Sequence, residues 1–259
     1  MIVLNEYEYA EQAIKERSLG NKPSETLTRV AKYHLYNGLT KSEVRKRLEE
    51  FIRMCDPTAA LPKWDKAIDY AISRAVKFEL VDIDSINITK KEIEVINNIE
   101  GRPCKRLAFT LLCLAKYWQA VNPSADYWVG NKDTEIMKLA NITTSLRKQS
   151  KMFSDMRDAG LLQFAKRVDS NAVKVCFVNN DGDIAMKIDN FRDLGNQYLM
   201  YIGEPYFMCK SCGRVMKQTH TEARGRKNCY CPDCAAKAKI KQSVESVMRS
   251  RCKAKETTE

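Results

Sequence analysis

Two pairs of cysteines near the C-terminus are the residues whose type and spacing point most directly to a chemistry. Cys209 and Cys212 form one Cys-x-x-Cys unit, and Cys231 and Cys234 form a second one after 18 intervening residues. Two residues between thiolates let both sulfurs reach one ion, and this spacing of the pairs is typical of four-thiolate zinc sites. Such a site is coordinatively closed, so we expect a structural, not a catalytic, Zn²⁺ that folds a small zinc ribbon.

Two neighbouring residues leave alternatives to this ligand set. Cys229 could replace Cys231, although a Cys-x-Cys unit is a poorer chelate and would lose the Pro-Asp turn before Cys234. His220 lies in the middle of the intervening loop, where an exposed imidazole is a better expectation than a ligand. An iron–sulfur cluster also uses thiolates, but the two Cys-x-x-Cys units favour zinc. The scattered cysteines elsewhere are expected to be reduced, small buried side chains.

The cysteine pairs lie in the most basic part of the chain. There are 44 Lys and Arg residues against 33 Asp and Glu residues, and +8 of the formal charge of +11 comes from residues 205–259. Such an uneven charge indicates a polyanionic partner, most commonly nucleic acid; a tail that only keeps the protein soluble is the alternative. The loop between the pairs contributes Arg224, Arg226 and Lys227, and a basic helix is expected over 235–251.

Composition and hydropathy exclude several classes of protein. With 44% hydrophobic and 30% charged residues, the sequence is typical of a folded globular protein and not of a disordered chain or a coiled coil. No run approaches the ~18 apolar residues that a bilayer-spanning helix needs, and the acidic start does not resemble a secretion signal. We therefore expect a cytoplasmic protein with no membrane partner.

Residues 1–80 are expected to form a helical bundle that serves protein contacts or self-association. Helical periodicity and helix-start residues predict helices over 6–17, 24–37, 40–54 and 62–78. Thr40 and Glu43 form a capping box for the third helix. Apolar residues that recur at helical spacing are expected to be core: Leu27, Val30, Ala31, Leu35, Val44, Leu48, Phe51 and Ile52.

After residue 80 the expected elements fall into an order that is typical of one fold. Alternation predicts a strand over 81–86, and Thr89 begins a second capping box. Beyond it the predicted elements are helices over 105–121, 134–140 and 145–159 and strands over 127–129, 162–168, 172–178 and 184–188. Helix, helix, turn, helix and hairpin is the order of a winged helix-turn-helix.

The expected fold class is therefore mainly α, with three folded parts. The boundaries that we predict are a bundle over 1–80, a linker with a short helix over 81–104, a winged helix-turn-helix over 105–188, a connector over 189–204, and a zinc ribbon with its basic helix over 205–259.

Residues 101–188 resemble the winged-helix domains of many transcription factors and of phage and plasmid replication proteins. In that family the third helix enters the major groove and the hairpin touches the backbone or minor groove, so the resemblance implies double-stranded DNA as the partner. The apolar side of the third helix would be Leu146, Phe153 and Met156. The residues that would contact DNA are Thr144, Arg147, Lys148 and Lys151 on the helix and Lys166, Arg167, Asn171 and Lys174 on the hairpin. A solvated basic face, or a winged helix that binds protein, is the alternative.

The cysteine pairs with their basic tail resemble the zinc-ribbon ends of phage and mobile-element proteins, a resemblance that implies no activity. Together these features favour a non-enzymatic DNA-binding protein that serves the replication or transcription regulation of such an element. An adaptor that assembles a replication, transcription or virion complex is the main alternative.

A small metal-dependent nuclease or primase is the second alternative. Asp82 and Asp84 alternate with apolar residues, as in the carboxylate pair that primase-type polymerases use to bind two divalent ions. Those enzymes also need a third carboxylate, a histidine and a large mixed sheet, for which residues 1–80 leave no room. Common nucleotide-binding, metalloprotease and hydrolase motifs do not occur in the sequence. We therefore expect the two carboxylates to lie on a solvated strand edge and assign no catalytic residue.

Overall fold

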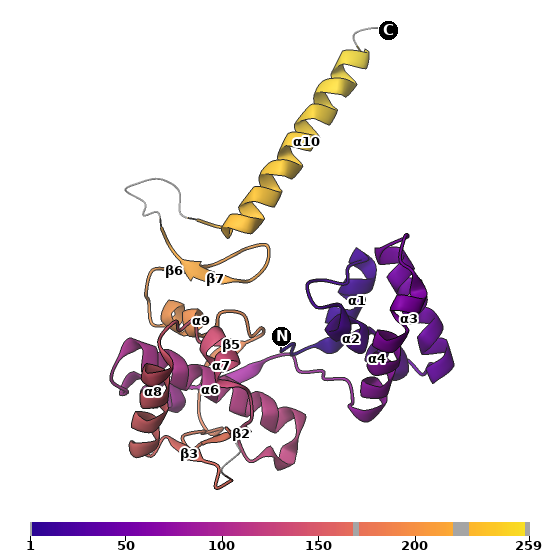
Figure 1. Cartoon of the computed structure of the whole chain (residues 1–259). Coiled ribbons are helices and arrows are strands. Elements are labelled where there is room, and N and C mark those ends of the chain that lie inside the picture. The colour runs from indigo at the N-terminus through magenta and orange to yellow at the C-terminus, as the bar shows by residue number, and fades with distance from the viewer. Residues whose placement is uncertain (1, 168–170, 220–227, 257–259) are drawn as a thin grey trace. The chain divides into compact units, whose positions relative to one another are not determined.

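The computed structural model describes residues 2–167, 171–219 and 228–256, and the chain divides into two compact units, Met1–Ile86 and Asn87–Glu259. The described residues are mainly helical, with small sheets of two or three strands (Figure 1). The mainly α fold class expected from the sequence is thereby confirmed. The segments that were predicted to be the middle and C-terminal domains belong to one compact unit.

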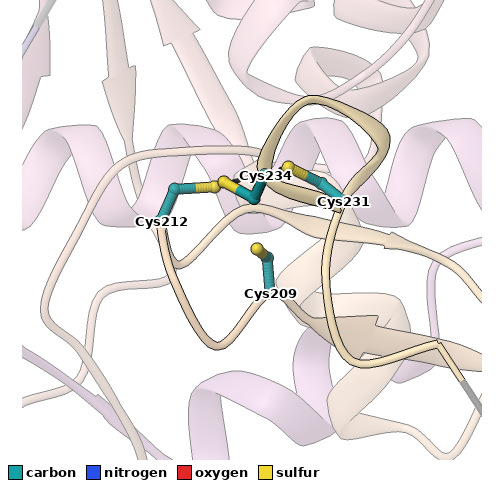
Figure 2. Close-up of side chains that lie close together, drawn as sticks. All are labelled: Cys209, Cys212, Cys231 and Cys234. Atoms are coloured by element: carbon teal, nitrogen blue, oxygen red, sulfur yellow. Dashed lines mark hydrogen bonds between the residues drawn. The ribbon is translucent and has the colours of Figure 1, made fainter. Parts of the chain in front are cut away.

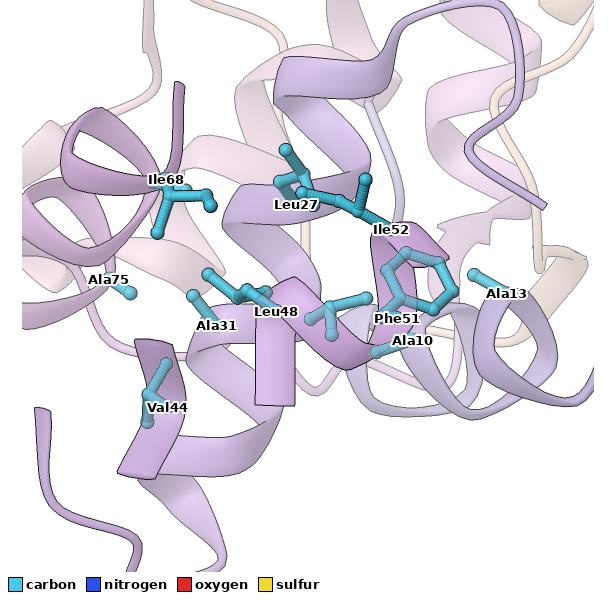
Figure 3. Close-up of a cluster of buried hydrophobic side chains, with 12 residues drawn as sticks. Ala10, Ala13, Leu27, Ala31, Val44, Leu48, Phe51, Ile52, Ile68 and Ala75 are labelled. Atoms are coloured by element: carbon cyan, nitrogen blue, oxygen red, sulfur yellow. The ribbon is translucent and has the colours of Figure 1, made fainter. Parts of the chain in front are cut away.

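The first unit is a helical bundle. Its elements are α1 (Glu6–Glu16), α2 (Pro23–Tyr36), α3 (Lys41–Cys55), the short 3₁₀ helix η1 (Leu61–Lys63) and α4 (Asp65–Lys77). Side chains from all four α-helices form one buried core, which contains every predicted core residue except Leu35 at its margin (Figure 3). The predicted capping box of Thr40 and Glu43 begins α3. Helix α2 begins at Pro23 and not after Ser24, because proline suits a first turn whose N–H groups need no helical partner.

A buried carboxylate lies at the edge of this bundle. Glu6, in the first turn of α1, accepts a hydrogen bond from Lys32 Nζ at 2.7 Å and another from the backbone N–H of Val81 at 3.1 Å. Arg29 Nε lies 3.5 Å from the other oxygen of the same carboxylate. The two cations offset the cost of burying the charge, so Glu6 ties α2 and the segment after α4 to the start of α1.

The second unit is built around α6 (Arg102–Val121). Residues 107–117 of this helix are all buried, because neighbouring elements cover it on every side. The elements that pack on it are α5 (Lys90–Asn97), η2 (Pro123–Ala125), β2 (Trp128–Val129), α7 (Asp133–Leu139), β4 (Val173–Val175) and α9 (Leu194–Tyr201). A helix that is buried all round, with Lys116 as its one charged residue in this segment, therefore forms the core of this unit.

A three-stranded antiparallel sheet combines the strand before α7 with the two strands that follow α8 (Leu146–Asp158). Its strand order is β2-β4-β3, where β3 is Leu162–Phe164, and Lys174 on the central strand pairs with Trp128 on one side and Gln163 on the other. The predicted hairpin is present, but both strands are shorter than predicted. The hairpin is joined through β4 to the short strand that precedes α7.

A strand was predicted over 81–86, but the strand in the structure begins at the last residue of that range. Strand β1 is Ile86–Thr89 and pairs with β5 (Ile184–Ile188), whereas Asp82 forms an isolated bridge with Asn5. The prediction of a strand was correct, but its position was wrong. The position depends on β5, a pairing partner from a distant part of the chain. Strand β5 has the predicted bounds.

A second buried carboxylate lies where β1 leads into α5. Glu92 completes the predicted capping box with Thr89 and accepts a hydrogen bond from Lys116 Nζ at 2.8 Å. The backbone N–H of Asn179 donates to its other oxygen at 2.8 Å. Glu92 thus holds α5, α6 and the segment before β5 together, and Lys116 neutralises it.

The predicted connector over 189–204 contains a buried helix, α9. It packs on α6 and on both strands of the hairpin formed by β6 (Tyr206–Met208) and β7 (Val215–Lys217), after which α10 (Pro232–Glu256) begins (Figure 1). No helix among the described residues combines the length and apolarity required to cross a membrane.

Helix α9 approaches α7 more closely than any side chain would allow. A Cβ atom at Gly195 would lie 2.0 Å from the carbonyl oxygen of Ala140, the residue that follows α7. We therefore expect Gly195→Ala to lower the free energy of unfolding by about 1–3 kcal/mol, the usual range for overpacking, as measured by urea denaturation. Gly130→Ala is the matched control, since a Cβ at Gly130 meets nothing within 4 Å. Equal stability of the two variants would contradict this packing.

Candidate metal centre and nucleic-acid interface

The four predicted ligand cysteines lie at the ends of neighbouring elements in the second unit. Cys209 directly follows β6, Cys212 lies in the turn before β7, Cys231 immediately precedes α10, and Cys234 lies in its first turn. Their sulfur atoms all lie within 4.8 Å of one another (Figure 2). Gly213 has a φ of +70°, which glycine adopts without strain, and its N–H closes the first turn on the carbonyl of Cys209 at 2.9 Å. The fold therefore brings both Cys-x-x-Cys units together.

The distance between two of these sulfurs suits ligands of one metal ion. Cys212 Sγ and Cys231 Sγ are 3.7 Å apart. Four sulfurs at ~2.3 Å from a tetrahedral zinc ion lie about 3.8 Å from one another, whereas a disulfide requires ~2.05 Å. Cys209 and Cys231 are buried, and Cys212 and Cys234 are half-buried. An ion held here would have four sulfur ligands and little access to solvent.

The backbone around the first pair favours a thiolate. Burial raises the pKa of the Cys209 thiol, but backbone N–H groups of Cys231, Cys212 and Ser211 that donate to its sulfur lower it to about 6. Burial raises the pKa of Cys212 to about 12, and hydrogen bonds with the adjacent thiols raise it as well because they favour the protonated form. A divalent cation takes the place of these protons, since metal binding displaces the thiol protons. The donor set therefore fits a metal ion.

Cationic side chains lie around the cysteine cluster. Arg192 Nη1 donates to the carbonyl oxygen of Cys212 at 2.7 Å. Arg214, two residues beyond Cys212, lies 3.6 Å from Asp233 at the start of α10, so it bridges the two cysteine turns. Four thiolates around one divalent ion carry a net charge of −2, and the Arg192 guanidinium is a positive charge beside it.

A chain of polar contacts joins the cysteine cluster to the turn between α7 and α8. The Asp193 carboxylate, just before α9, lies 3.4 Å from Arg214 Nε and accepts a hydrogen bond from Asn141 Nδ2 at 2.9 Å. The carbonyl of Asn141 accepts in turn from Arg106 Nη1 on α6 at 3.0 Å. The sequence predicted a turn at Asn141, but it contained no pattern that identified Asp193, Arg214 or Arg106 as its partners.

The alternative ligands are placed differently from the four cysteines. Cys231, and not Cys229, belongs to the sulfur cluster, within the part of the chain that the structure describes. Cys229 has an exposed side chain, and its carbonyl accepts from the N–H of Lys210 at 3.0 Å. His220 and the basic loop residues Arg224, Arg226 and Lys227 lie outside the described residues.

Helix α8 presents the predicted basic side chains on its surface. Arg147, Lys148 and Lys151 are exposed, and Thr144 in the preceding turn is half-buried. Phe153 and Met156 lie on the buried side as predicted, together with Met152. Leu146 was also predicted on that side, which is wrong. Its side chain is 74% exposed, because the buried part of α8 begins only at Met152.

The hairpin supplies fewer unpaired charges than predicted. Lys166 and Arg167 are exposed beyond β3, and Asn171 is exposed before β4, while residues 168–170 lie outside the described ranges. Lys174, on β4, forms an ion pair with Asp126, so its charge already has a partner. Lys166 and Arg167 are the hairpin cations that form no ion pair with another residue in the part of the chain that the structure describes.

Asp82 and Asp84, the carboxylate pair of the nuclease or primase alternative, are distant in sequence from the cysteine cluster and from α8. Asp82 and Asp84 are both exposed, as expected for a solvated edge. Among the described residues, the four cysteines form the only group of three or more His, Cys, Asp and Glu side chains that lie close enough to share a metal ion. The structure therefore brings no third ligand to this pair within its described part.

No family model, curated protein or solved structure matches this chain.

Metal analysis of the purified protein tests the cluster. We expect about one tightly bound ion per chain, which is lost in Cys209→Ser because three thiolates and a hydroxyl bind zinc far less well. Cys229→Ser is the matched control, since it removes an adjacent thiol but leaves the four clustered sulfurs, and it should retain the ion. Loss of the ion in Cys229→Ser with retention in Cys231→Ser would assign the ligand set differently.

Proposed function

We propose that the protein binds double-stranded DNA through a winged helix-turn-helix domain formed by α6 to β4, next to a zinc ribbon on Cys209, Cys212, Cys231 and Cys234. It would act in the replication or transcription regulation of a phage or mobile element, and not as an enzyme. The observation that carries the proposal is the exposed basic surface at the start of α8.

The order of the elements supports the winged-helix part of the proposal. Helix α6, strand β2, helices α7 and α8 and the β3–β4 hairpin follow one another in the order that this domain requires. The turn from α7 to α8 is six residues long, from Ala140 to Ser145. Pairing of β2 with β4 holds the hairpin to the strand before α7, so the hairpin and α8 belong to one packed body.

The electrostatics of α8 favour a phosphate-rich partner at its N-terminal half. Arg147, Lys148 and Lys151 are exposed there, while the acidic side chains Asp155 and Asp158 lie in the C-terminal half. The unpaired N–H groups of a helix start add positive potential to that same end. An arginine can bind a guanine edge or a phosphate through two parallel hydrogen bonds, and lysines supply charge. The polarity of the helix therefore directs its first turns toward DNA.

Leu146 adds a feature that phosphate binding alone does not need. A leucine that is 74% exposed at the first position of α8 is costly in water and gains from an apolar contact. In the major groove the methyl group of thymine offers such a contact beside the hydrogen-bonding base edges. Leu146 together with Arg147 therefore favours sequence-selective binding over contacts to phosphates alone.

The zinc ribbon contributes to the proposal through its charge. The segment 205–259 carries most of the net positive charge, and the proposal includes its loop residues Arg224, Arg226 and Lys227 as phosphate contacts. Zinc is the ion that two Cys-x-x-Cys units with this geometry favour. Its role would be to fold the module that carries these cations.

A protein partner is the second candidate, and α10 is the observation that favours it. Ile240 and Val244, one helical turn apart, are 65% and 49% exposed on this helix. Neighbouring apolar side chains at helical spacing gain free energy when a partner covers them. An adaptor function would use this face instead of α8.

A titration of labelled duplex DNA at several salt concentrations tests the DNA-binding proposal. If about six phosphates are neutralised, log affinity should fall against log salt with a slope near −5, since each contributes ~0.9. The double variant Arg147→Ala, Lys148→Ala should bind at least tenfold more weakly with an unchanged melting temperature, because both side chains are exposed.

The control double variant is Lys46→Ala, Lys66→Ala, which removes the same charge from exposed positions of the first unit. It should bind DNA almost as well as the natural chain. A salt slope near zero in the natural chain would exclude the proposal and leave the adaptor function. Equal weakening by both double variants would move the interface away from α8.

A further inference from the structure

Arg106, on the second turn of α6, forms no ion pair with any carboxylate in the described parts of the chain. Its Nη1 donates to the carbonyl of Asn141, and its Nε–H is buried without a hydrogen-bond partner among the described residues. Burial lowers the pKa of this guanidinium and the like charge of Arg102 lowers it further, while the charges of Tyr206 and Glu204 offset only part of this. A partly buried cation in this state is unfavourable until an anion joins it.

A hollow of about 340 Å³ lies beside Arg106, between the start of α6 and the side of α8. Lys148 and Lys151 line it from α8, three residues apart and therefore on the same side of that helix. Asp155 is the one acidic residue in this lining. Three cations against one carboxylate leave the hollow with a net charge of about +2.

Hydroxyl groups complete the polar lining. Thr143 and Thr144, in the turn before α8, both border the hollow, the first exposed and the second half-buried. Arginine, lysine and threonine side chains are groups that bind phosphate oxygens at protein–DNA interfaces. The two non-bridging oxygens of a phosphodiester, like the oxygens of a free phosphate, can accept from several of these donors at once.

We propose that this hollow binds a phosphate group, which Arg106 holds together with Lys148 and Lys151. The phosphate would be a phosphodiester of the duplex backbone, which passes the start of α6 while α8 lies in the groove. In this respect the inference rests on the proposed function and deepens it. A phosphate on a free small molecule has the same chemistry, so the experiment separates the two sources.

The first arm of the experiment measures duplex binding by the full chain. Arg106→Gln removes the charge but keeps a donor for the carbonyl of Asn141. We expect about tenfold weaker binding to every duplex sequence and a salt slope that is smaller by about 1, as for the loss of one charged phosphate contact. Lys105→Gln is the matched control, because it removes a charge from the neighbouring position outside the hollow. It should leave the affinity and the slope almost unchanged.

The second arm measures thermal unfolding in rising concentrations of inorganic phosphate, with the ionic strength held constant by NaCl. A site for phosphate raises the melting temperature of the natural chain and of Lys105→Gln, but not of Arg106→Gln. This result together with an unchanged duplex slope in Arg106→Gln assigns the hollow to a free phosphorylated ligand. A reduced slope assigns it to the DNA backbone.

The two arms also separate the two proposals. If the natural chain does not bind DNA, the proposed function fails and the phosphate arm alone decides this inference. If Arg106→Gln does not fold, the double variant Lys148→Gln, Lys151→Gln, whose side chains are exposed, takes its place in the phosphate arm. The inference would be overturned if the natural chain and Arg106→Gln bind duplex DNA with the same salt slope and phosphate does not raise the melting temperature of the natural chain.

Discussion

The second unit depends on the close approach of α9 to the end of α7. Backbone lies against backbone at Gly195 and Ala140, and the adjacent Asp193 accepts from Asn141 while pairing with Arg214. Because α9 also packs on α6 and on the β6–β7 hairpin, one helix places the cysteine turns and the turn before α8 against the same core. The candidate metal centre and the basic helix thus belong to one packed body, joined by the contacts of α9 and Asp193.

Features that local chemistry determines were predictable from the sequence. The capping boxes at Thr40 and Thr89 need only residues three apart, and both are present. The helical stripes of the first unit are buried apart from Leu35 at the margin, because amphipathic spacing gives each of these helices one apolar side. The clustering of Cys209 with Cys231 was likewise predictable, since Cys-x-x-Cys units at this spacing have one common arrangement.

Features that depend on distant partners were not predictable. Helix α9 has no capping side chain, and its Gly195 would by propensity argue against a helix; only packing on α6 and α7 explains it. Leu146 matches the apolar spacing of α8, yet nothing covers the first turn there. Arg106 has ordinary surroundings in the sequence, and its role depends on a turn that lies 35 residues further along.

Ion pairs neutralise several cations within the described parts of the protein, but none of them involves Arg147, Lys148 or Lys151 on α8. Each buried carboxylate has its own cation: Glu6 pairs with Lys32, and Glu92 with Lys116. Even Lys174 on the hairpin has Asp126 as a partner. These three cations are neutralised by carboxylates of the fold itself. Arg106 differs from them at the one hollow that it shares with two further cations, which is the arrangement expected where the missing charge comes from a ligand.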